Sequence, residues 1–187
     1  MKRCPIHNMP MRRRHNSTIE QCPRCLIVKN NRIIERSVFK KAPKFNLYQT
    51  TAWKWFSRYV LLYYADKNAV AICATSGRRM SINSKQCHAG HYIKVNDMNS
   101  TNYSTAFDFR NVAPQYYRDN HYGGGRMDRM REHLVGKHGE DAIKELEAKR
   151  HQAFHLDKAT LDQIAAEYKA KFKQLLIDRE MQNPWEK

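Results

Sequence analysis

The chain has no apolar run that approaches the roughly eighteen residues needed to cross a membrane. Its first residues, MKRCPIH, contain no apolar segment of the kind found in a secretory signal peptide. Acidic residues are also scarce, with 18 Asp and Glu against 34 Lys and Arg in 187 residues. We therefore expect no membrane span and no signal peptide, and we expect a cytoplasmic protein whose net charge is +16.

The positive charge is concentrated in the first two thirds of the chain. Residues 1–45 contain 12 Lys and Arg against 2 Asp and Glu, and residues 46–125 contain 9 against 4. Residues 126–187 are nearly balanced, with 13 against 12. A basic surface of this size suits a polyanion, most often nucleic acid, and Tyr116 and Tyr117 add aromatic rings to it. We therefore expect DNA as a partner, and a merely cationic protein is the alternative.

Cysteine is limited to five residues, and without a secretory signal their spacing favours metal binding over disulfides. A CxxH pair and a CxxC pair stand near the start, with fourteen residues between them: Cys4, His7, Cys22 and Cys25. Two knuckles with two ligands each fill the four tetrahedral positions of a structural Zn²⁺. Residues 1–28 are thus predicted to form a zinc ribbon, and a disordered basic arm is the alternative. Three arginines between the knuckles either contact DNA phosphates or form a solvated run of charge: Arg12, Arg13 and Arg14.

The stretch after the predicted ribbon divides into a linker and a helix. Residues 29–50 are polar and basic, which predicts a linker. From Trp53 onward, apolar and aromatic residues form two stripes at helical spacing, which predicts a buried helix; stacking on unpaired bases is the alternative. A short strand is expected at residues 70–73. Cys73 and Cys87 lack partners at ligand spacing, so we interpret them as small buried hydrophobes.

Histidine and asparagine recur in a distinctive order from Cys87 to Gly125. His88 and His91 lie three apart at the start of a predicted β-hairpin, and Asn111 and Asn120 follow nine apart. A histidine strand, an asparagine at the loop, and a further asparagine at the start of a helix is the order typical of the ββα-metal (HNH) nuclease site.

Hydrolysis of a phosphodiester needs a base for water and a cation for the phosphate. His91 is the candidate base, because a neutral imidazole accepts a proton at neutral pH; a core histidine is the alternative. Asn120 offers an amide oxygen to Mg²⁺ or Mn²⁺, with His88 as the second ligand. Other candidates for that second position are Asp108, Asp119 and His121. Asn111 is expected to hold the loop by bonding to backbone, and an ordinary turn asparagine is the alternative.

Basic residues flank this predicted site, and we expect two or more of them to contact the DNA backbone. The candidates are Lys94, Arg110, Arg118, His121 and Arg126. The glycines at residues 123–125 either bring backbone N–H groups close to a phosphate or form a flexible turn.

Helices are predicted for the remainder of the chain. Residues 126–137 are expected to continue the helix of the metal site, which Gly139 then ends. Further apolar periodicity spans residues 142–150, and Asp157 is the predicted N-cap of a last helix. These helices are expected to pack on each other and on the helix of Trp53. They also offer a homodimer interface, whose two-fold symmetry would suit a four-way DNA junction.

The chain resembles the NinG/Rap family of phage recombination endonucleases. Five blocks carry the resemblance, in the same order over residues 51–180: AICATSG, HAGHY, FRNVAPQYYRDNHYGGG, HGEDAIKELE and IAAEYKAKFKQLL. The resemblance implies a Mg²⁺-dependent endonuclease of the host cytoplasm that cuts branched intermediates such as D-loops and Holliday junctions. It also implies recombination proteins as possible partners.

Three departures from the family pattern accompany this resemblance. Where the family has a CxxC pair before the hairpin, the chain has Cys73 and Ser76. Where the family has a second pair, the chain has Tyr116 and Asp119, and His88 replaces an acidic residue. We therefore expect no second, site-supporting zinc. Its role would fall to packing by Tyr116, Tyr117 and Val112.

The predicted fold is therefore α+β, with a zinc ribbon followed by a ββα-metal core wrapped by helices. The domains are expected at residues 1–28 for the ribbon, 29–50 for the linker, 51–135 for the nuclease core and 136–187 for a helical module. Composition alone supports only a basic protein that acts on DNA. The alternatives are an HNH enzyme that cuts duplex DNA, of the homing or packaging type, and a non-catalytic junction-binding recombination protein.

Overall fold

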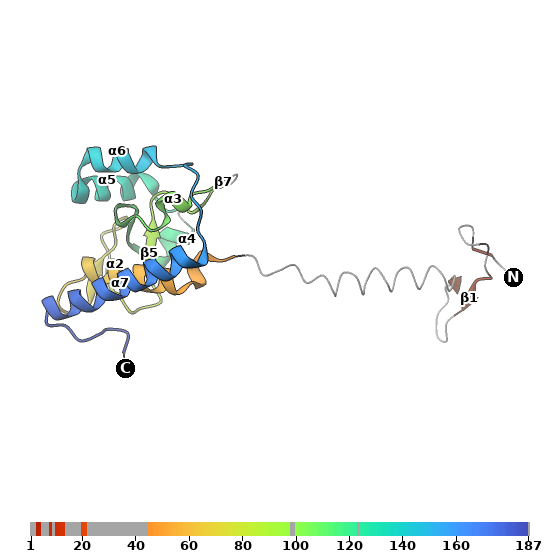
Figure 1. Cartoon of the computed structure of the whole chain (residues 1–187), viewed down its shortest axis with the longest axis horizontal. Coiled ribbons are helices and arrows are strands. Elements are labelled where there is room, and N and C mark those ends of the chain that lie inside the picture. The colour runs from red at the N-terminus through yellow and green to blue at the C-terminus, as the bar shows by residue number, and fades with distance from the viewer. Residues whose placement is uncertain are drawn as a thin grey trace. The chain divides into compact units, whose positions relative to one another are not determined.

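The computed structural model describes most of the chain beyond residue 44 and short segments before it. The described residues are 3–4, 8, 10–13, 20–21, 45–97, 100–122 and 124–186. The chain divides into two compact units, Met1–Phe45 and Asn46–Lys187. Helices and small two-stranded sheets are both present (Figure 1), so the α+β class is confirmed. Across the described residues, no helix is both long and apolar enough to span a bilayer.

The N-terminal unit contains a small hairpin and a buried cysteine. Strand β1 (Arg12–Arg13) pairs antiparallel with β2 (Glu20–Gln21). Cys4 is buried, and its carbonyl accepts a hydrogen bond of 2.9 Å from the backbone N–H of Asn8. The other three predicted zinc ligands and the third arginine of the run lie outside the described residues: His7, Cys22, Cys25 and Arg14. The zinc ribbon therefore stays a prediction.

The aromatic helix predicted around Trp53 is α2 (Thr51–Tyr64). A short 3-10 helix, η1 (Leu47–Gln49), precedes it. The helix begins where the Thr50 hydroxyl accepts a hydrogen bond of 3.1 Å from Trp53 N–H, which satisfies one of the free donors of the first turn. Its buried residues recur at helical spacing: Ala52, Phe56, Val60, Leu61 and Leu62.

The last helix, α7 (Lys158–Asp178), begins at the predicted N-cap. The Asp157 carboxylate accepts a hydrogen bond of 2.8 Å from Thr160 N–H. In Figure 1, α7 and α2 lie side by side, and rings from both helices meet edge to face in their interface. Arg179, just after α7, donates hydrogen bonds of 2.7–2.9 Å to three carbonyls at the end of α2. The last carbonyls of α2 and of its C-cap thereby gain side-chain partners.

The two histidines lie on β5 (Cys87–His91), which pairs antiparallel with β8 (Val112–Tyr116). In this register His91 is opposite Val112 and His88 is opposite Gln115. The predicted hairpin thus exists, with a long connection that has structure of its own. That connection contains β6 (Asn96–Asp97), β7 (Ser100–Thr101), α3 (Tyr103–Ala106) and η2 (Phe109–Asn111). A second hairpin, β3 (Val70–Ile72) with β4 (Arg79–Ser81), lies before β5.

The predicted helix across residues 126–137 does not continue the helix of the site. The site helix, α4 (Tyr117–His121), is short, and a separate helix α5 (Met127–His138) follows it. Gly124, Gly125 and Arg126 have positive φ angles of 63°, 87° and 43°. Three residues in succession with left-handed φ cannot continue a right-handed helix. This turn directs the chain from α4 into α5.

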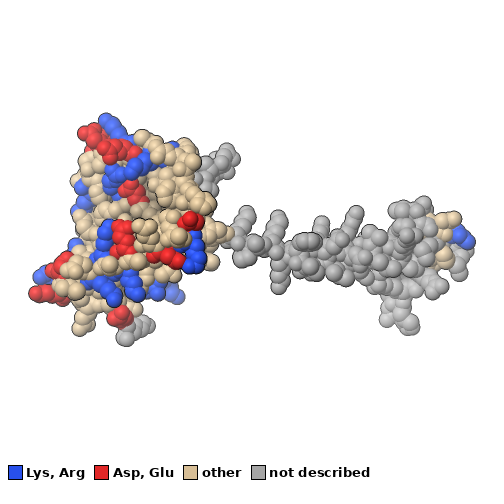
Figure 2. Space-filling view, in the orientation of Figure 1, with Lys and Arg blue, Asp and Glu red and all other residues tan. Residues whose placement is uncertain are grey.

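Two helical pairs enclose the central hairpin. Helices α2 and α7 cover one side of β5 and β8, while α5 packs on α6 (Glu140–Ala148) at the other side (Figure 1). Residues 136–187, which were expected to pack together as one module, thus contribute to both sides. The reason is that the buried residues of α6 fit those of α5, while the rings of α7 fit those of α2. Figure 2 shows basic and acidic side chains interspersed on the face that carries α7.

Candidate functional site

Strand β5 presents His88 and His91 to opposite sides of the hairpin. Successive side chains of a strand alternate in direction, so residues three apart face opposite ways. The ring of His91 stacks on Trp53 of α2, with 4.8 Å between centroids. The ring of His88 instead meets Asn120 of α4. The predicted base and the predicted metal ligand therefore flank the strand.

His91 is held in one orientation by a backbone carbonyl. Its Nε2 lies 2.9 Å from the carbonyl oxygen of Ala106, and the side chain is almost wholly buried. Because a carbonyl only accepts, Nε2 must carry the hydrogen, and the lone pair of the neutral ring is on Nδ1. Burial lowers the pKa of His91 to about 4, even though the Ala106 bond acts in the opposite direction. The ring is thus neutral at physiological pH, with Nδ1 able to accept a proton.

Asn111 ties three backbone groups together beside His91. Its Oδ1 accepts a hydrogen bond of 2.7 Å from Ile93 N–H, and its Nδ2 donates to Ile93 O at 3.1 Å and Thr105 O at 2.9 Å. The side chain is fully buried. Thr105 is the neighbour of Ala106, whose carbonyl fixes His91. Asn111 therefore holds the loop backbone as expected, although a part in catalysis stays a prediction.

His88, Asn120 and His121 come together on the α4 side of β5. The amide Nδ2 of Asn120 lies 3.4 Å from His88 Nδ1, and the rings of His88 and His121 are 5.6 Å apart between centroids. Burial and the neighbouring His121 lower the pKa of His88, against a backbone hydrogen bond at Lys85 that raises it. A lowered pKa favours the neutral imidazole, which is the form that binds metals.

The donors of this cluster fit a borderline divalent cation better than Mg²⁺. Mg²⁺ prefers oxygen ligands, whereas imidazole nitrogen suits Zn²⁺, Fe²⁺ and Ni²⁺. His88 and His121 offer two imidazoles, and Asn120 offers one amide oxygen if its amide is turned. Within the described residues, no three His, Cys, Asp or Glu side chains are grouped closely enough to share one metal ion. The protein ligands would therefore be few.

Asp108, one alternative metal ligand, is committed to a network of ion pairs. Its carboxylate lies 2.8 Å from Arg110 and 3.6 Å from Lys149, and Arg110 also meets Glu145 at 3.1 Å. Burial raises the pKa of Asp108, but the bonds and charge of Arg110 outweigh it and lower the pKa overall. Asp108 thus bonds to Arg110 and Lys149 and is ionised there. Arg110 has two acidic partners in Asp108 and Glu145, and its contact with DNA stays a prediction.

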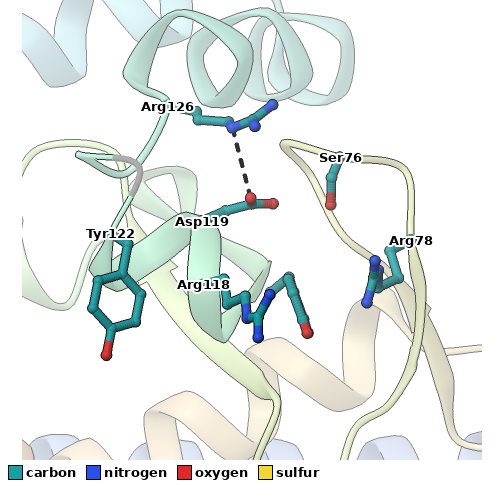
Figure 3. Close-up of a pocket in the computed structure, with 7 residues that line it drawn as sticks. Ser76, Arg78, Arg118, Asp119, Tyr122 and Arg126 are labelled. Carbon is teal, nitrogen blue, oxygen red and sulfur yellow. Dashed lines mark ion pairs between the residues drawn. The ribbon is translucent and has the colours of Figure 1, made fainter.

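Asp119, the other carboxylate candidate, points away from His88 and towards the β3–β4 turn. Its Oδ2 accepts hydrogen bonds from Thr75 Oγ1 at 3.0 Å and Cys73 Sγ at 3.6 Å, and Oδ1 lies 3.6 Å from Arg126 Nε (Figure 3). Tyr116 N–H in turn donates to Cys73 Sγ at 3.2 Å.

The positions at which the chain departs from the family's cysteine pairs thus lie together. Hydrogen bonds join them, and the expected packing is present as well, because Tyr116 and Val112 belong to apolar clusters. Cys73 is accordingly a hydrogen-bonding group as well as a buried one.

The remaining predicted DNA contacts differ in how available they are. Lys94, Arg118 and His121 are exposed. Arg126 is half exposed and pairs with Asp119. For Arg12 and Arg13 the structure describes backbone alone.

Three residues near the site were not predicted to belong to it. Trp53 stacks on His91, and Tyr48 meets the same ring edge-on at 6.2 Å. Trp53 was interpreted as core, because an aromatic stripe on a helix does not reveal which residue it will face. Arg78 lies beside Tyr116 across the β3–β4 turn. The AICATSG block, which resembles the family and directly precedes Arg78, was the one feature of the sequence that pointed to a role for that loop.

One protein-family model matches the chain. The model described as bacteriophage lambda NinG protein matches residues 27–179. No curated protein and no solved structure shows a significant match to the chain. The matched range contains every described residue of the candidate site.

Proposed function

Because the chain belongs to the family of the bacteriophage lambda NinG protein, a family with a recombination-related function in phages, we propose that it is a divalent-metal-dependent DNA endonuclease. Its substrates are branched recombination intermediates such as D-loops and Holliday junctions. The family supports the link to recombination, and the cleavage chemistry is our proposal from the site.

The orientation of His91 is the observation that carries this proposal. A carbonyl holds Nε2–H and Trp53 supports one ring face, so Nδ1 has a fixed direction, and the lowered pKa keeps the ring neutral. Among the described residues Nδ1 has no hydrogen-bond partner, so its lone pair can take a proton. The arrangement suits a general base with a fixed tautomer.

The proposed reaction is hydrolysis of one phosphodiester bond. His91 Nδ1 takes a proton from water while the water oxygen forms a bond to phosphorus, and the bond from phosphorus to the leaving oxygen breaks. The leaving oxygen then gains a proton from solvent. A divalent cation held by His88, Asn120 and His121 would stabilise negative charge on the phosphate and on the leaving oxygen.

The edge of β5 is where the phosphate must lie in this proposal. Among the described strands β5 pairs with β8 alone, so its second edge has no strand partner. Groups on both faces of a strand can reach a ligand at its edge. His91 from one side and His88 with Asn120 from the other can therefore act on one phosphate.

The proposal is tested by cleavage of labelled substrates with and without divalent metal. The set consists of linear duplex, single strand, D-loop and four-way junction of the same sequence. We expect metal-dependent cutting of the branched substrates. Equal cutting of linear duplex would instead identify an HNH enzyme that acts on duplex DNA. Binding of branched DNA without cutting in Mg²⁺, Mn²⁺ or Zn²⁺ would identify a non-catalytic junction-binding protein.

Replacing His88 with aspartate is expected to change the metal preference. A carboxylate supplies the oxygen ligand that Mg²⁺ prefers. We expect the ratio of the Mg²⁺-supported to the Zn²⁺-supported cleavage rate to rise at least about tenfold, which corresponds to about 1.4 kcal/mol. The control is His155→Asp, an equal change of charge at an exposed loop residue. An unchanged ratio in His88→Asp would remove His88 from the proposed ligands.

A further inference from the structure

A cationic pocket lies next to the candidate metal ligands, on the far side of α4. It has a volume of about 560 Å³. Three arginines, two tyrosines, one serine and one aspartate line it (Figure 3): Arg78, Arg118, Arg126, Tyr116, Tyr122, Ser76 and Asp119. The arginines come from the β3–β4 turn, from α4 and from the turn before α5. Three segments of the chain thus bring positive charge to one hollow.

Two of the three guanidinium groups are available for a ligand. Within the described part of the chain, neither Arg78 nor Arg118 forms an ion pair. Arg78 lies over the ring of Tyr116, at 4.4 Å from its centroid, which presets the direction of its planar group. Three arginines against one carboxylate leave a net positive charge. Such a pocket favours an anion with several oxygen acceptors, such as a phosphate diester.

Asp119 and the turn before α5 give this pocket a rigid wall. Thr75 and Cys73 occupy one oxygen of the carboxylate, and Arg126 is paired to the other. Gly125 N–H donates to the backbone carbonyl of Asp119 at 3.1 Å. Arg126 itself has a φ of 43°, an uncommon conformation for a residue other than glycine. Asp119 therefore serves to orient Arg126, and it leaves the other two arginines free.

Tyr122 adds an exposed aromatic ring to the pocket. Tyr122 is 78% exposed, which is more than any other large hydrophobic residue described. A series of ring contacts leads from it to the candidate metal ligands: Tyr122 to Tyr117 at 6.0 Å, and Tyr117 to His88 at 5.3 Å. A DNA strand with a phosphate at His88 would therefore pass these rings before it reaches the arginines of the pocket.

We propose that this pocket binds an unpaired nucleotide of the DNA next to the cleaved phosphate. The arginines hold its phosphate, and its base stacks on Tyr122. A base inside a duplex is stacked on both faces and offers no face to a tyrosine, whereas a displaced or unpaired base does. This inference rests on the proposed function and deepens it, because it names the feature by which branched DNA is recognised.

The test is DNA binding by fluorescence anisotropy in EDTA, where no cleavage takes place. Labelled D-loop, single strand and linear duplex are compared. Tyr122→Ala is expected to weaken binding of D-loop and single strand roughly tenfold, and of duplex less than about twofold. Tyr122→Phe keeps the ring and is expected to bind like the wild type. Because Tyr122 is exposed, these variants should retain the fold, which circular dichroism would verify.

Arg78→Ala is the second arm, and Arg79→Ala is its matched control. Arg79 is the adjacent residue, equally basic, but it pairs with Asp66 at 3.2 Å and does not line the pocket. Loss of one phosphate contact is expected to reduce the slope of log affinity against log salt by about 0.7 for single strands. Arg79→Ala should change that slope less.

Two outcomes would overturn the pocket. One is Arg78→Ala with the same affinity and slope as Arg79→Ala. The other is Tyr122→Ala with equal weakening of duplex and D-loop, which would mean general contact without selection of unpaired bases. Neither outcome depends on cleavage. If the protein selects D-loops through Tyr122 but cuts no DNA, the proposed nuclease activity is refuted and the pocket is not. If the protein cuts DNA but its pocket variants bind DNA like the wild type, the pocket is refuted and the nuclease activity is not.

Discussion

Replacing His91 with alanine is expected to lower the rate of metal-dependent DNA cleavage by about 10²- to 10⁴-fold, the usual contribution of a general base. DNA binding is expected to stay within about twofold of the wild type, because His91 is buried and carries no charge at neutral pH. The single-turnover cleavage rate and the affinity in EDTA would be measured on the same D-loop. The expected result is a loss of rate with no loss of affinity.

Alanine at residue 91 also leaves a cavity beside Trp53, so a second variant is needed. His91→Gln fills more of the space and can donate to Ala106 O, yet its amide is not a base at neutral pH. His138→Ala is the control, since His138 is a partly buried histidine on α5 that contacts Tyr64 OH at 3.4 Å. We expect full activity for the control and, for His91→Gln, a loss of rate as large as that of His91→Ala. Wild-type activity in both His91 variants would show that the base lies elsewhere.

The pH dependence of cleavage provides an independent measure of His91. Its pKa in the folded protein is about 4, below the ordinary value of 6.5. Between these two values the unfolded chain binds the proton and the folded chain does not, so the contribution of His91 to stability is complete above pH 6.5 and is lost as the pH falls towards 4. Over pH 6 to 8 the base stays deprotonated. The acid limb of the cleavage rate should therefore lie below pH 6, which a rate profile would establish.

The local sequence pattern predicted the helices, the strands and the loop-holding role of Asn111 better than it predicted which side chains contact each other. The cap at Asp157 and the break at Gly139 depend on neighbours in sequence, and both were predicted. The opposite directions of His88 and His91 were also readable, because a spacing of three in a strand places two side chains on opposite faces. We assigned His91 as the base and His88 as a metal ligand by analogy with the nuclease order, without using this alternation. The alternation adds that the two side chains must approach a shared phosphate from opposite faces of β5.

Other parts of the site depend on contacts between distant residues. Arg110 and Asp119 look available in sequence, but one meets Glu145 and the other meets Cys73 and Thr75. Nothing in the local composition predicts these pairs, which form when β3, α4 and α6 pack around the hairpin. Arg78 was missed for the same reason. The left-handed conformation of Arg126 could not be foreseen either, since a residue other than glycine rarely adopts it.

Replacing Asn111 with alanine is expected to reduce the free energy of unfolding by about 3 kcal/mol or more. The side chain makes three hydrogen bonds to buried backbone, and each group left without a partner costs about 1–3 kcal/mol, partly recovered if water enters. Urea denaturation measures this change. The control is Asn83→Ala, because Asn83 bonds to Ser81 and Pro184 at the exposed surface. We expect less than about 1 kcal/mol there.

Stability alone does not distinguish a positioning role of Asn111 from a purely structural one. Asn111 holds Thr105, and the next residue holds His91, so loosening this loop should admit water to the ring. Burial is the larger of the two influences on the pKa of His91, and its loss should raise that pKa from about 4 towards 6.5. Nuclear magnetic resonance titration of the folded Asn111→Ala protein measures this shift. A folded variant with an unchanged His91 pKa and undiminished cleavage would show that Asn111 stabilises the loop without positioning the base.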